Sequence, residues 1–358
     1  MQPIRLVVVF GGQSAEHAVS CTTASHVLAA ADPTRYSIEA VGITRAGEVV
    51  RADAAMQALS EGARMLPPAL IADGTAIDLH SAVVPASSEQ RVVVLPLLHG
   101  PLGEDGTMQG LLELANVPYV GAGVLGSAVT MDKAMAKVVL GAAGIPQTKW
   151  VTLFEHEDIS DTALASIADD LGFPLFVKPA NMGSSIGVSR ATTTTELRAG
   201  VDAAFVYDDV LVIEEGVDAR EVELAVLGNH DVRVSVPGEI KPAADFYDYD
   251  DKYHDGAAEL LIPAPLDDAV VAELTELAER AYRVLRCEGM ARADFLIEEG
   301  GRGPLLNELN TIPGFTPISM YPKLWEASGL SYSALIDELV QLAIERFERR
   351  AVKRPSVS

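Results

Sequence analysis

Ala-Arg-Ala-Asp-Phe-Leu-Ile at residues 291–297 and Leu-Leu-Asn-Glu-Leu-Asn at residues 305–310 predict the two strands of one hairpin. The linker between them, Glu-Gly-Gly-Arg-Gly at 299–303, holds the glycines that a hairpin turn favours. Residues two apart in a strand share a face. We therefore expect a register centred on Gly301, which gathers the polar side chains of both strands on one side of a sheet.

The polar face of this hairpin predicts a metal site. The register places Asp294 opposite Glu308, and it places Arg292 opposite Asn310. Carboxylates that face each other destabilise a sheet unless a cation lies between them. Asp, Glu and Asn together offer only oxygen ligands, which suits Mg²⁺ with water and phosphate completing its shell. The arginine beside them offers charge-assisted hydrogen bonds to an anion. The alternative is a solvated sheet face with scattered charges.

The composition excludes several classes of protein. The chain has 358 residues, more than one core usually serves, so we expect two or three domains. Its 51 acidic and 27 basic residues give a net charge of −24, which would repel nucleic acids and anionic membranes. Cys21 and Cys287 lack metal-site spacing and favour a reducing compartment. The apolar run 6–10 is too short for a signal or a membrane span, so we expect a cytoplasmic protein.

The first third of the chain alternates short β-branched strands with helices, which predicts a parallel sheet covered by helices. Strands are expected at 6–10, 38–43 and 92–95, and a helix at 14–30. Residues 116–123 break this pattern. We therefore place a first, Rossmann-like domain at 1–123.

Two further domains are expected at 124–215 and 216–358. The second begins with a helix at 130–141 capped by Thr130, and continues in the order β-α-β-β-α-β of a split-βαβ unit. Its elements are expected at 150–154, 160–171, 175–179, 185–190, 194–204 and 210–215. The third is expected to hold a hairpin (221–227 and 232–237), a helix (267–286), the polar hairpin described above and a final helix (333–349).

Two lysines are candidates for phosphate contacts. Lys178 ends a predicted strand and precedes the glycine-rich loop 183–187, whose backbone could approach phosphate closely. A hairpin turn without function is the alternative for this loop. Lys133 falls in the first turn of its predicted helix, where the helix dipole disfavours a cation. An anionic partner would offset that cost, although a solvent-exposed lysine is the alternative.

Two acidic segments complete the candidates. Glu16 falls in the first turn of a predicted helix after the first strand, where open α/β sheets bind their ligands. Its alternative is simple complementarity to the helix dipole. The segment 245–255 is acidic, rich in tyrosine and carries Lys252. Polar loops of this length often close over active sites, and the alternative is a solvated lysine in an acidic loop.

Taken in order, these motifs resemble the D-alanine–D-alanine ligases of the ATP-grasp superfamily. The resemblance runs almost from end to end. Its blocks are Phe10-Gly-Gly-x-Ser-x-Glu-His, Leu98-His-Gly-x-x-Gly-Glu-Asp-Gly106, Met131-Asp-Lys133, Val177-Lys-Pro, Gly183-Ser-Ser-x-Gly187, Phe246-Tyr-Asp-Tyr-x-x-Lys-Tyr253, Arg292-x-Asp294 and Asn307-Glu-x-Asn-Thr-x-Pro-Gly314.

The resemblance implies an ATP-grasp fold with ATP between the second and third domains. It implies ligation of two D-alanines through a D-alanyl phosphate, for peptidoglycan precursors, by a typically dimeric cytoplasmic enzyme. The implied cofactors are ATP and two Mg²⁺ ions, for which Mn²⁺ can substitute. Closure of the 245–255 segment as a lid would exclude water, which otherwise hydrolyses the acyl phosphate.

The resemblance also implies a role for each matching residue. The implied nucleotide contacts are Lys133 and Lys178 at the α- and β-phosphates, Lys252 at the γ-phosphate, Glu214, Glu215, Gly216 and Val217 at the adenine, Glu221 at the ribose, and also Phe246 and Asn307. The implied metal ligands are Asp294, Glu308 and Asn310. The implied substrate contacts are Glu16 with Ser184 and Tyr253 at the first ammonium, Arg292 and the Gly314 amide at the oxyanion, and Ser319 at the second carboxylate.

The chain departs from the family pattern at one place. A common family variant has lysine and an aromatic residue where this chain has Glu215 and Gly216, so a side-chain contact with adenine is in doubt. Relatives that couple D-alanine to D-lactate usually carry phenylalanine or histidine at the position of Tyr253, so the tyrosine favours the dipeptide. A second alternative is a nucleotide-binding protein that has lost catalysis, and the intact residues Asp294, Glu308, Asn310, Arg292 and Lys252 argue against it. A third is an ATP-grasp ligase for a different amino acid, and its discriminator is the pocket around Glu16, Ser184 and Tyr253, which matches the D-alanine family.

Overall fold

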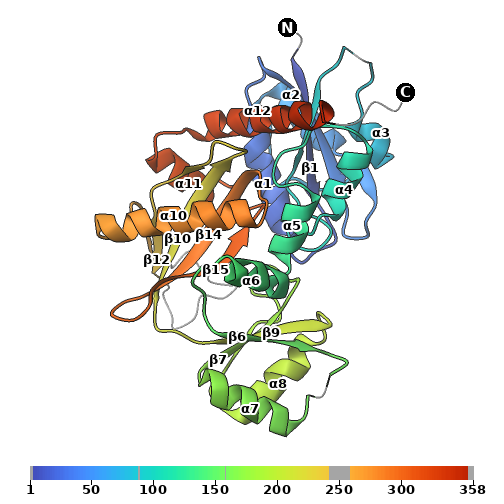
Figure 1. The fold of residues 1–358 in the computed structure, drawn as a ribbon. Helices are drawn as coiled ribbons and strands as arrows, with labels where there is room; N and C mark the ends of the chain where they lie inside the picture. Colours follow the sequence, from blue (N-terminus) through green and yellow to red (C-terminus); the bar gives the residue numbers. More distant parts are fainter. Residues whose placement is uncertain (1–2, 88, 158, 242–258, 354–358) are drawn as a thin grey trace.

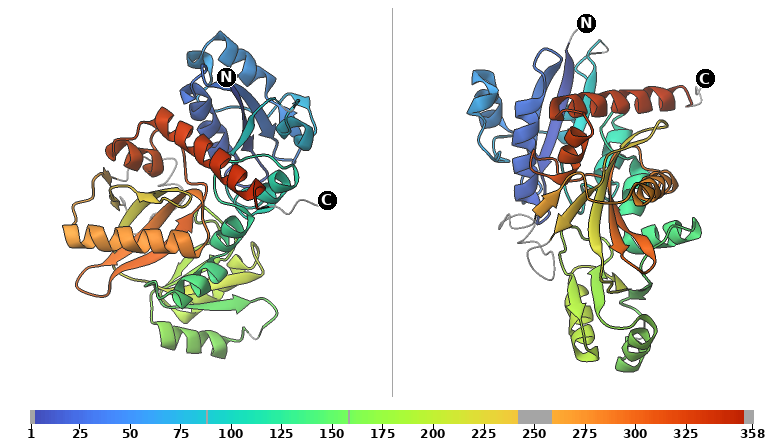
Figure 2. Two further views of the ribbon diagram at one scale, coloured as in Figure 1. Left: turned by 45° about the horizontal axis from the view of Figure 1, so that its top comes forward. Right: turned by 90° about the vertical axis from the view of Figure 1, so that its left-hand side faces the viewer.

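The computed structural model describes residues 3–87, 89–157, 159–241 and 259–353. Within these residues the chain forms three β-sheets with helices packed on them, which confirms the predicted α/β class (Figure 1). The sheet nearest the N-terminus and the small sheet that carries α7 and α8 lie at opposite ends of the molecule (Figures 1 and 2). The third sheet lies between them.

The first sheet has the strand order β4-β3-β2-β1-β5. The strands are β1 (Ile4–Gly11), β2 (Tyr36–Ile43), β3 (Val49–Arg51), β4 (Thr75–Ala76) and β5 (Val92–Pro96). The three predicted strands β1, β2 and β5 are parallel. The strands β3 and β4, which were not predicted, extend the sheet beyond β2 and pair in antiparallel fashion. Residues 6–10 are fully buried, with alternate side chains entering two different apolar cores. Both faces of this sheet are therefore covered.

Helices pack on this sheet as the strand–helix alternation predicts. They are α1 (His17–Ala30), α2 (Asp53–Glu61), a short 3-10 helix (Ala63–Met65), α3 (Leu79–Val83) and α4 (Thr107–Leu114). The predicted start of the first helix at residue 14 is wrong. Because α1 begins at His17, Glu16 is its N-cap residue and not a member of its first turn.

The small sheet has the order β6-β9-β7-β8 with antiparallel neighbours. Its elements are β6 (Trp150–Phe154), α7 (Asp161–Leu171), β7 (Leu175–Pro179), β8 (Ser189–Ala191), α8 (Thr194–Ala204) and β9 (Val210–Glu215). The predicted β-α-β-β-α-β order is confirmed. The predicted strand at 185–190 is too long, because residues 184–187 form turns and pairing begins at Ser189.

Two helices precede the small sheet, where one was predicted. They are α5 (Val124–Met131) and α6 (Lys133–Ala142). Thr130 is not an N-cap but a buried residue near the end of α5. The cap of α6 is Asp132, whose Oδ1 accepts a hydrogen bond from the Met135 N–H at 2.9 Å. Lys133 is therefore the first residue of α6, close to the predicted position.

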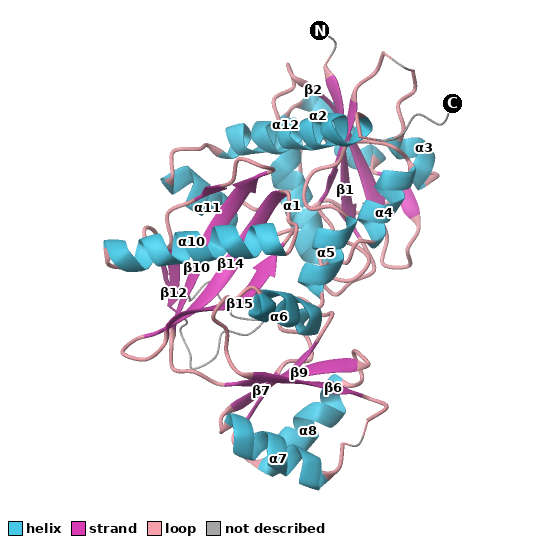
Figure 3. Ribbon diagram, in the orientation of Figure 1, coloured by secondary structure: helices cyan, strands magenta, loops and turns pink. Residues whose placement is uncertain are grey.

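The third sheet has the order β13-β12-β10-β14-β15, and β11 pairs with β10 (Figure 3). Its strands are β10 (Arg220–Gly228), β11 (Arg233–Val234), β12 (Gly238–Lys241), β13 (Glu259–Leu261), β14 (Gly289–Glu298) and β15 (Gly303–Asn310). The predicted strand at 232–237 is wrong in its length, since only the two residues of β11 pair before the chain turns into β12. The helix α10 (Asp268–Val284) covers one face of this sheet (Figure 3).

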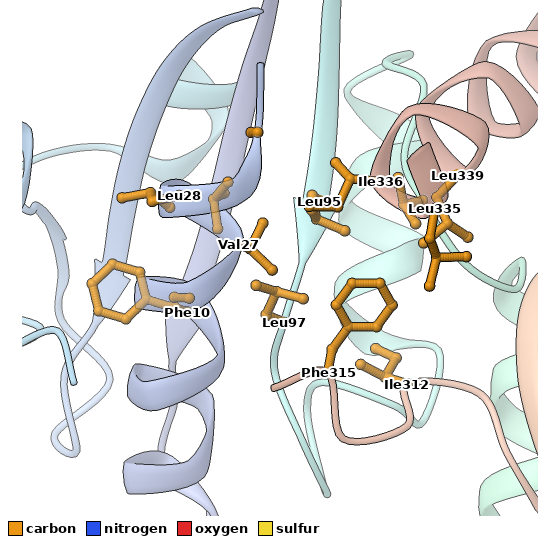
Figure 4. Packing of buried hydrophobic residues seen from close by; sticks show 14 of the residues in the cluster. Phe10, Val27, Leu28, Leu95, Leu97, Ile312, Phe315, Leu335, Ile336 and Leu339 are labelled. Carbon is orange, nitrogen blue, oxygen red and sulfur yellow. The ribbon is translucent and has the colours of Figure 1, made fainter. Parts of the chain in front are cut away.

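The last helices contribute side chains to the core that the first sheet enters. They are α11 (Met320–Ala327) and α12 (Tyr332–Ala351). Leu335, Ile336 and Leu339 of α12 enter the same core as Phe10 and Leu95 of the first sheet (Figure 4). The buried guanidinium of Arg346 adds polar contacts, since it donates hydrogen bonds to the carbonyls of Tyr119 and Gly121. The C-terminal helix thus forms part of the N-terminal core.

None of the helices in the described ranges combines the length and apolar character that a membrane crossing requires. Both cysteines are free and buried. The expected absence of a disulfide framework therefore holds for this chain.

Candidate active site

A cavity of about 600 Å³ lies between the small sheet and the third sheet. Residues from α6, β7 and β9 line one side of it, and residues from β10, β12, β14 and β15 line the other. The predicted site residues on its wall are Lys133, Lys178, Ser184, Glu214, Glu215, Val217, Glu221, Arg292, Asp294, Asn307 and Glu308. Lys252, Tyr253 and Phe246 lie outside the described residues.

The polar hairpin lies on the wall of this cavity, and its predicted register is confirmed at the polar face. Asp294 pairs with Glu308, and Arg292 pairs with Asn310. The register then shifts, because Phe295 pairs with Leu306 and leaves Asn307 as the extra residue of a bulge. A bulge re-aims the side chains around it. Asn307 and Glu308, although adjacent, both line the cavity.

Arg292 neutralises the carboxylates at this face. Its Nε lies 2.7 Å from Asp294 Oδ1 and its second nitrogen 2.7 Å from Oδ2, which is a bidentate pair. The same Nε lies 3.1 Å from Glu223 Oε2. Burial disfavours the guanidinium charge, but the carboxylates of Asp294 and Glu223 outweigh it and hold the pKa of Arg292 well above its usual value.

The two predicted phosphate lysines approach this face from the small-sheet side. Lys133 donates a hydrogen bond from Nζ to the carbonyl of Met182 at 2.6 Å, and its Nζ lies 4.0 Å from Glu308 Oε2. Lys178 lies 3.5 Å from Asn307 Oδ1. Both ammonium groups are half-buried and next to acceptors of β15. The cavity therefore has cations on both of its sides.

Glu214, at the base of the cavity, is buried and ionised. Its Oε1 lies 3.3 Å from Lys178 Nζ, its Oε2 lies 3.3 Å from Lys137 Nζ, and Oε2 also accepts a hydrogen bond from Thr148 Oγ1 at 2.8 Å. Burial opposes the negative charge, but Lys178, Lys137 and Thr148 together lower the pKa of Glu214 to about 2. Both oxygens of its side chain are thus occupied by lysines.

A contact between Glu16 and Ser184 joins the end of the first sheet to the glycine-rich loop 183–187. Glu16 is 6% exposed and accepts a hydrogen bond from Ser184 Oγ. Gly100 and Gly183 pack against the Glu16 carboxylate, since a Cβ at either position would lie 3.1 or 2.9 Å from Oε2. Ser184 has a φ of 48°, an uncommon value for a residue other than glycine. The contact of Glu16 with Ser184 brings the predicted substrate residue of the first sheet to the edge of the cavity.

Gly314 and Ser319 lie beside each other but outside the described wall of the cavity. A Cβ on Gly314 would lie 3.1 Å from Ser319 Oγ. The same hydroxyl accepts a hydrogen bond from the Thr316 N–H at 3.1 Å, and Ser319 is the N-cap residue of α11. The chain just before Gly314 also lies close to Glu16. The carbonyl of Ile312 is 3.0 Å from Nδ1 of His99, and the next residue, Gly100, packs against the Glu16 carboxylate.

Comparison with known proteins adds the decisive observation. Residues 5–122 match the family model "D-ala D-ala ligase N-terminus", and residues 139–341 match "D-ala D-ala ligase C-terminus". The chain belongs to the D-alanine–D-alanine ligase family. The predicted family is therefore confirmed, and with it the ATP-grasp fold. Ligases of this family use ATP with a divalent metal.

Individual relatives match this ligase over nearly its whole length. A D-alanine–D-alanine ligase of Thermoanaerobacter sp. is 46% identical over 96% of this chain and 98% of its own, and one of Streptococcus agalactiae is 42% identical over 96% and 97%. The solved D-alanine-D-alanine ligase of Coxiella burnetii is 36% identical, covers 99% of this chain and 97% of its own, and has a TM-score of 0.82. The solved VanG D-Ala:D-Ser ligase of Enterococcus faecalis is 33% identical over 96% and 100%, with a TM-score of 0.79.

The oxygen ligands of the polar hairpin fit a divalent metal in the ligase. Asp294 and Glu308 are opposed by the backbone register, and the exposed fractions of their side chains, 14% and 37%, leave them accessible from the cavity. Asn310 is less available, because its Oδ1 accepts a hydrogen bond from the Ile312 N–H at 3.1 Å. An amide oxygen has a second lone pair, so this hydrogen bond still leaves one acceptor position.

Glu215 and Gly216, which were predicted to contact adenine, make other contacts in this structure. Glu215 accepts hydrogen bonds from the Arg302 guanidinium and from the Lys149 N–H, the latter at 2.7 Å. The Gly216 N–H donates to the carbonyl of Pro174 at 2.7 Å. A Cβ on Gly216 would lie 2.9 Å from that oxygen, so an aromatic side chain cannot be accommodated with the backbone placed here.

Sequence reasoning missed five polar residues at this site. They are His99, Glu104, Lys137, Thr148 and Glu223, all buried. His99 and Glu104 stand inside a motif that was used only for the resemblance. Lys137 could have been found, because it lies one helical turn after Lys133 and therefore on the same face of α6. No sequence signal distinguishes Thr148 or Glu223 from ordinary surface residues.

Proposed function

We propose that this ligase joins two molecules of D-alanine while ATP is converted to ADP and phosphate, through a D-alanyl phosphate intermediate. One observation supports this most directly. The contact of Glu16 with Ser184 places a buried carboxylate, suited to an ammonium group, beside a cavity that presents Lys133, Lys178 and Arg292. An amino acid held at Glu16 would direct its own carboxylate toward the cations that suit a phosphate.

The nucleotide would lie in the cavity between the two sheets. Lys133 and Lys178 would contact the α- and β-phosphates, and Asn307 lies within reach of Lys178. The adenine would lie against the backbone of residues 214–217, and Glu221 would bind the ribose. We assign Lys252 to the γ-phosphate and Phe246 to the nucleotide from the family pattern alone.

Two Mg²⁺ ions, or Mn²⁺ in their place, would be held by Asp294, Glu308 and Asn310. When bound, such ions neutralise charge on the transferred phosphoryl group. Arg292 would then share its charge between Asp294 and the oxyanion of the tetrahedral intermediate, together with the Gly314 amide. Ser319 would hold the carboxylate of the second D-alanine.

The acyl phosphate requires that water be excluded, because it hydrolyses readily. Closure of the 245–255 segment would supply this exclusion and would bring Tyr253 to Glu16 and Ser184. We also propose the division into domains at 1–123, 124–215 and 216–358, a homodimer, and a cytoplasmic location for the enzyme. The free, buried state of both cysteines suits that reducing compartment.

The test is a phosphate-release assay with ATP and Mg²⁺ across D-alanine, L-alanine, D-serine and D-lactate. We expect phosphate release when D-alanine is the only amino acid added, and mass spectrometry should identify D-alanyl-D-alanine as the product. L-alanine should give at least tenfold less phosphate. A depsipeptide as the main product at neutral pH, when D-lactate is present with D-alanine, would overturn the choice of second substrate. Release that requires a different amino acid would overturn the assignment of the first.

A further inference from the structure

A buried lysine that the proposed function does not use lies behind Lys178. The side chain of Lys137 is 3% exposed, and its Nζ lies 3.3 Å from Glu214 Oε2 and 3.3 Å from Thr148 Oγ1. Lys178 is 17% exposed and approaches the other carboxylate oxygen, Oε1, at 3.3 Å. The Glu214 carboxylate is therefore shared between one ammonium that lines the cavity and one that lies beneath it.

Such a buried charge requires an explanation. Removing an ammonium group from water disfavours its charged form, and burial indeed lowers the pKa of Lys137 despite the opposing effect of Glu214. A neutral, well-packed side chain of similar size is often at least as stable in such a position. Simple packing therefore does not account for a lysine here, whereas an electrostatic role does.

The charges of the cluster show what that role is. Lys178 and Glu214 alone would form a neutral pair, and an ion pair has little attraction left for a phosphate. Adding Lys137 gives the three side chains a net charge of +1. The hydrogen bond from Thr148 Oγ1 to Oε2 at 2.8 Å keeps that oxygen on the Lys137 side. Of the Glu214 carboxylate, Oε1 is then the oxygen that opposes the charge of Lys178.

We propose that Lys137 is a positioning residue for the nucleotide phosphates: it binds one oxygen of Glu214, so that Lys178 keeps a net positive charge directed into the cavity. This rests on the proposed function, in which Lys178 contacts the α- and β-phosphates. Lys133 and Lys137 lie one helical turn apart on the same face of α6. Lys133, one turn earlier, reaches the cavity wall at Met182, and Lys137 lies beneath that wall.

The test measures ADP and adenosine affinities of Lys137→Met by calorimetry with Mg²⁺ present. Methionine preserves most of the length and removes the charge. We expect the affinity for ADP to fall about tenfold, equivalent to about 1.4 kcal/mol. The affinity for adenosine, which has no phosphate, should change less than twofold. The ratio of the two affinities is the readout, since it cancels any change at the adenine end.

A double variant separates charge balance from packing. In Lys137→Met with Glu214→Gln, the cluster again carries +1, now from Lys178 alone, so the ADP-to-adenosine ratio should return to within about threefold of wild type. The matched control is Lys149→Met, which removes the same charge from an exposed position next to Thr148 and should leave the ratio unchanged. Circular dichroism melts establish that each variant is folded.

Three results would overturn the inference. They are an unchanged ratio in Lys137→Met, an equal loss of adenosine affinity in that variant, and a double variant no better than the single one. If the single variant does not fold, the double variant decides alone, and a ratio far below wild type rejects the inference. Failure of the proposed nucleotide site is distinct, because wild-type protein would then bind neither ADP nor adenosine, and failure of the proposed substrate would appear in the phosphate-release assay while wild-type ADP binding persists.

Discussion

Asp294 and Glu308 lie directly opposite each other in β14 and β15, and the strand register shifts by one residue immediately beyond them. Opposed carboxylates repel each other, and here Arg292 compensates one of them with a bidentate pair. Glu308, at 37% exposure, is the more accessible of the two. The pair is held by backbone geometry, so changing either side chain should alter chemistry more than folding.

Asp294→Asn and Glu308→Gln should each reduce ATP-dependent phosphate release by about 100-fold or more, because a weaker metal site stabilises the transferred phosphoryl group poorly. The thermal unfolding transition should remain cooperative. Glu299→Gln is the control, since it removes a charge from an exposed position in the turn of the same hairpin. Undiminished release in both site variants would reject the metal assignment.

Gly216→Ala should destabilise the protein by about 1–3 kcal/mol, because the added methyl would lie 2.9 Å from the Pro174 carbonyl oxygen and something must shift. The KM for ATP should rise with it, since residue 216 is part of the proposed adenine hinge. Urea unfolding measures the first effect and steady-state kinetics the second. The control is Gly110→Ala in α4, where a Cβ meets nothing within 4 Å and helix propensity favours alanine. Equal stability changes in the two variants would contradict the steric argument.

Glu214 should contribute to the acid sensitivity of the fold. Its pKa is lowered from 4.5 to about 2 in the folded state, so its contribution is present above pH 4.5 and is lost as the pH falls from 4.5 toward 2. We expect the unfolding free energy of wild type to fall more steeply in this window than that of Lys137→Met with Glu214→Gln, by on the order of 3 kcal/mol. Urea titrations at several pH values measure the difference. Parallel curves would show that the cluster does not couple to folding.

Glu104 should have the opposite dependence. Burial and the nearby Glu16 carboxylate raise its pKa well above 4.5, although the hydrogen bond from the Gly100 N–H, at 2.7 Å, and the charge of Lys133 act in the opposite direction. Its contribution to stability is therefore lost as the pH rises from 4.5 through the folded-state pKa. Glu104→Gln removes this dependence, so the variant should gain stability relative to wild type as the pH rises through the range above 4.5. A constant difference across that range would contradict a raised pKa.

The polar hairpin shows how far sequence reasoning extends. The turn glycines and the two-residue period of a strand were enough to predict which carboxylates oppose each other. The bulge could not be predicted in this way. The alternation of polar and apolar residues along one strand does not reveal an extra residue until the partner strand and its register are known. It makes Asn307 and Glu308 face the cavity together, which a regular strand would forbid.

The buried lysine shows why the rest of the site could not be predicted. The sequence places Lys137 on the same face of its helix as Lys133, but its burial could not be predicted, because its partners, residues 148 and 214, lie outside α6. The start of the predicted helix at 130–141 was wrong for a local reason. Asp132 is the N-cap of α6, so that helix begins at Lys133, and residues 130 and 131 belong to the separate helix α5.

The packing of α12 against the first sheet has a consequence for how the chain is made. Translation produces the strands of that sheet long before the helix that covers one of its faces. Until residues 332–351 have left the ribosome, the apolar side chains around Phe10 and Leu95 lack part of their core. The N-terminal third therefore cannot complete its core before α12 is made, and a nascent chain stalled shortly before α12 would expose a surface suited to chaperone binding.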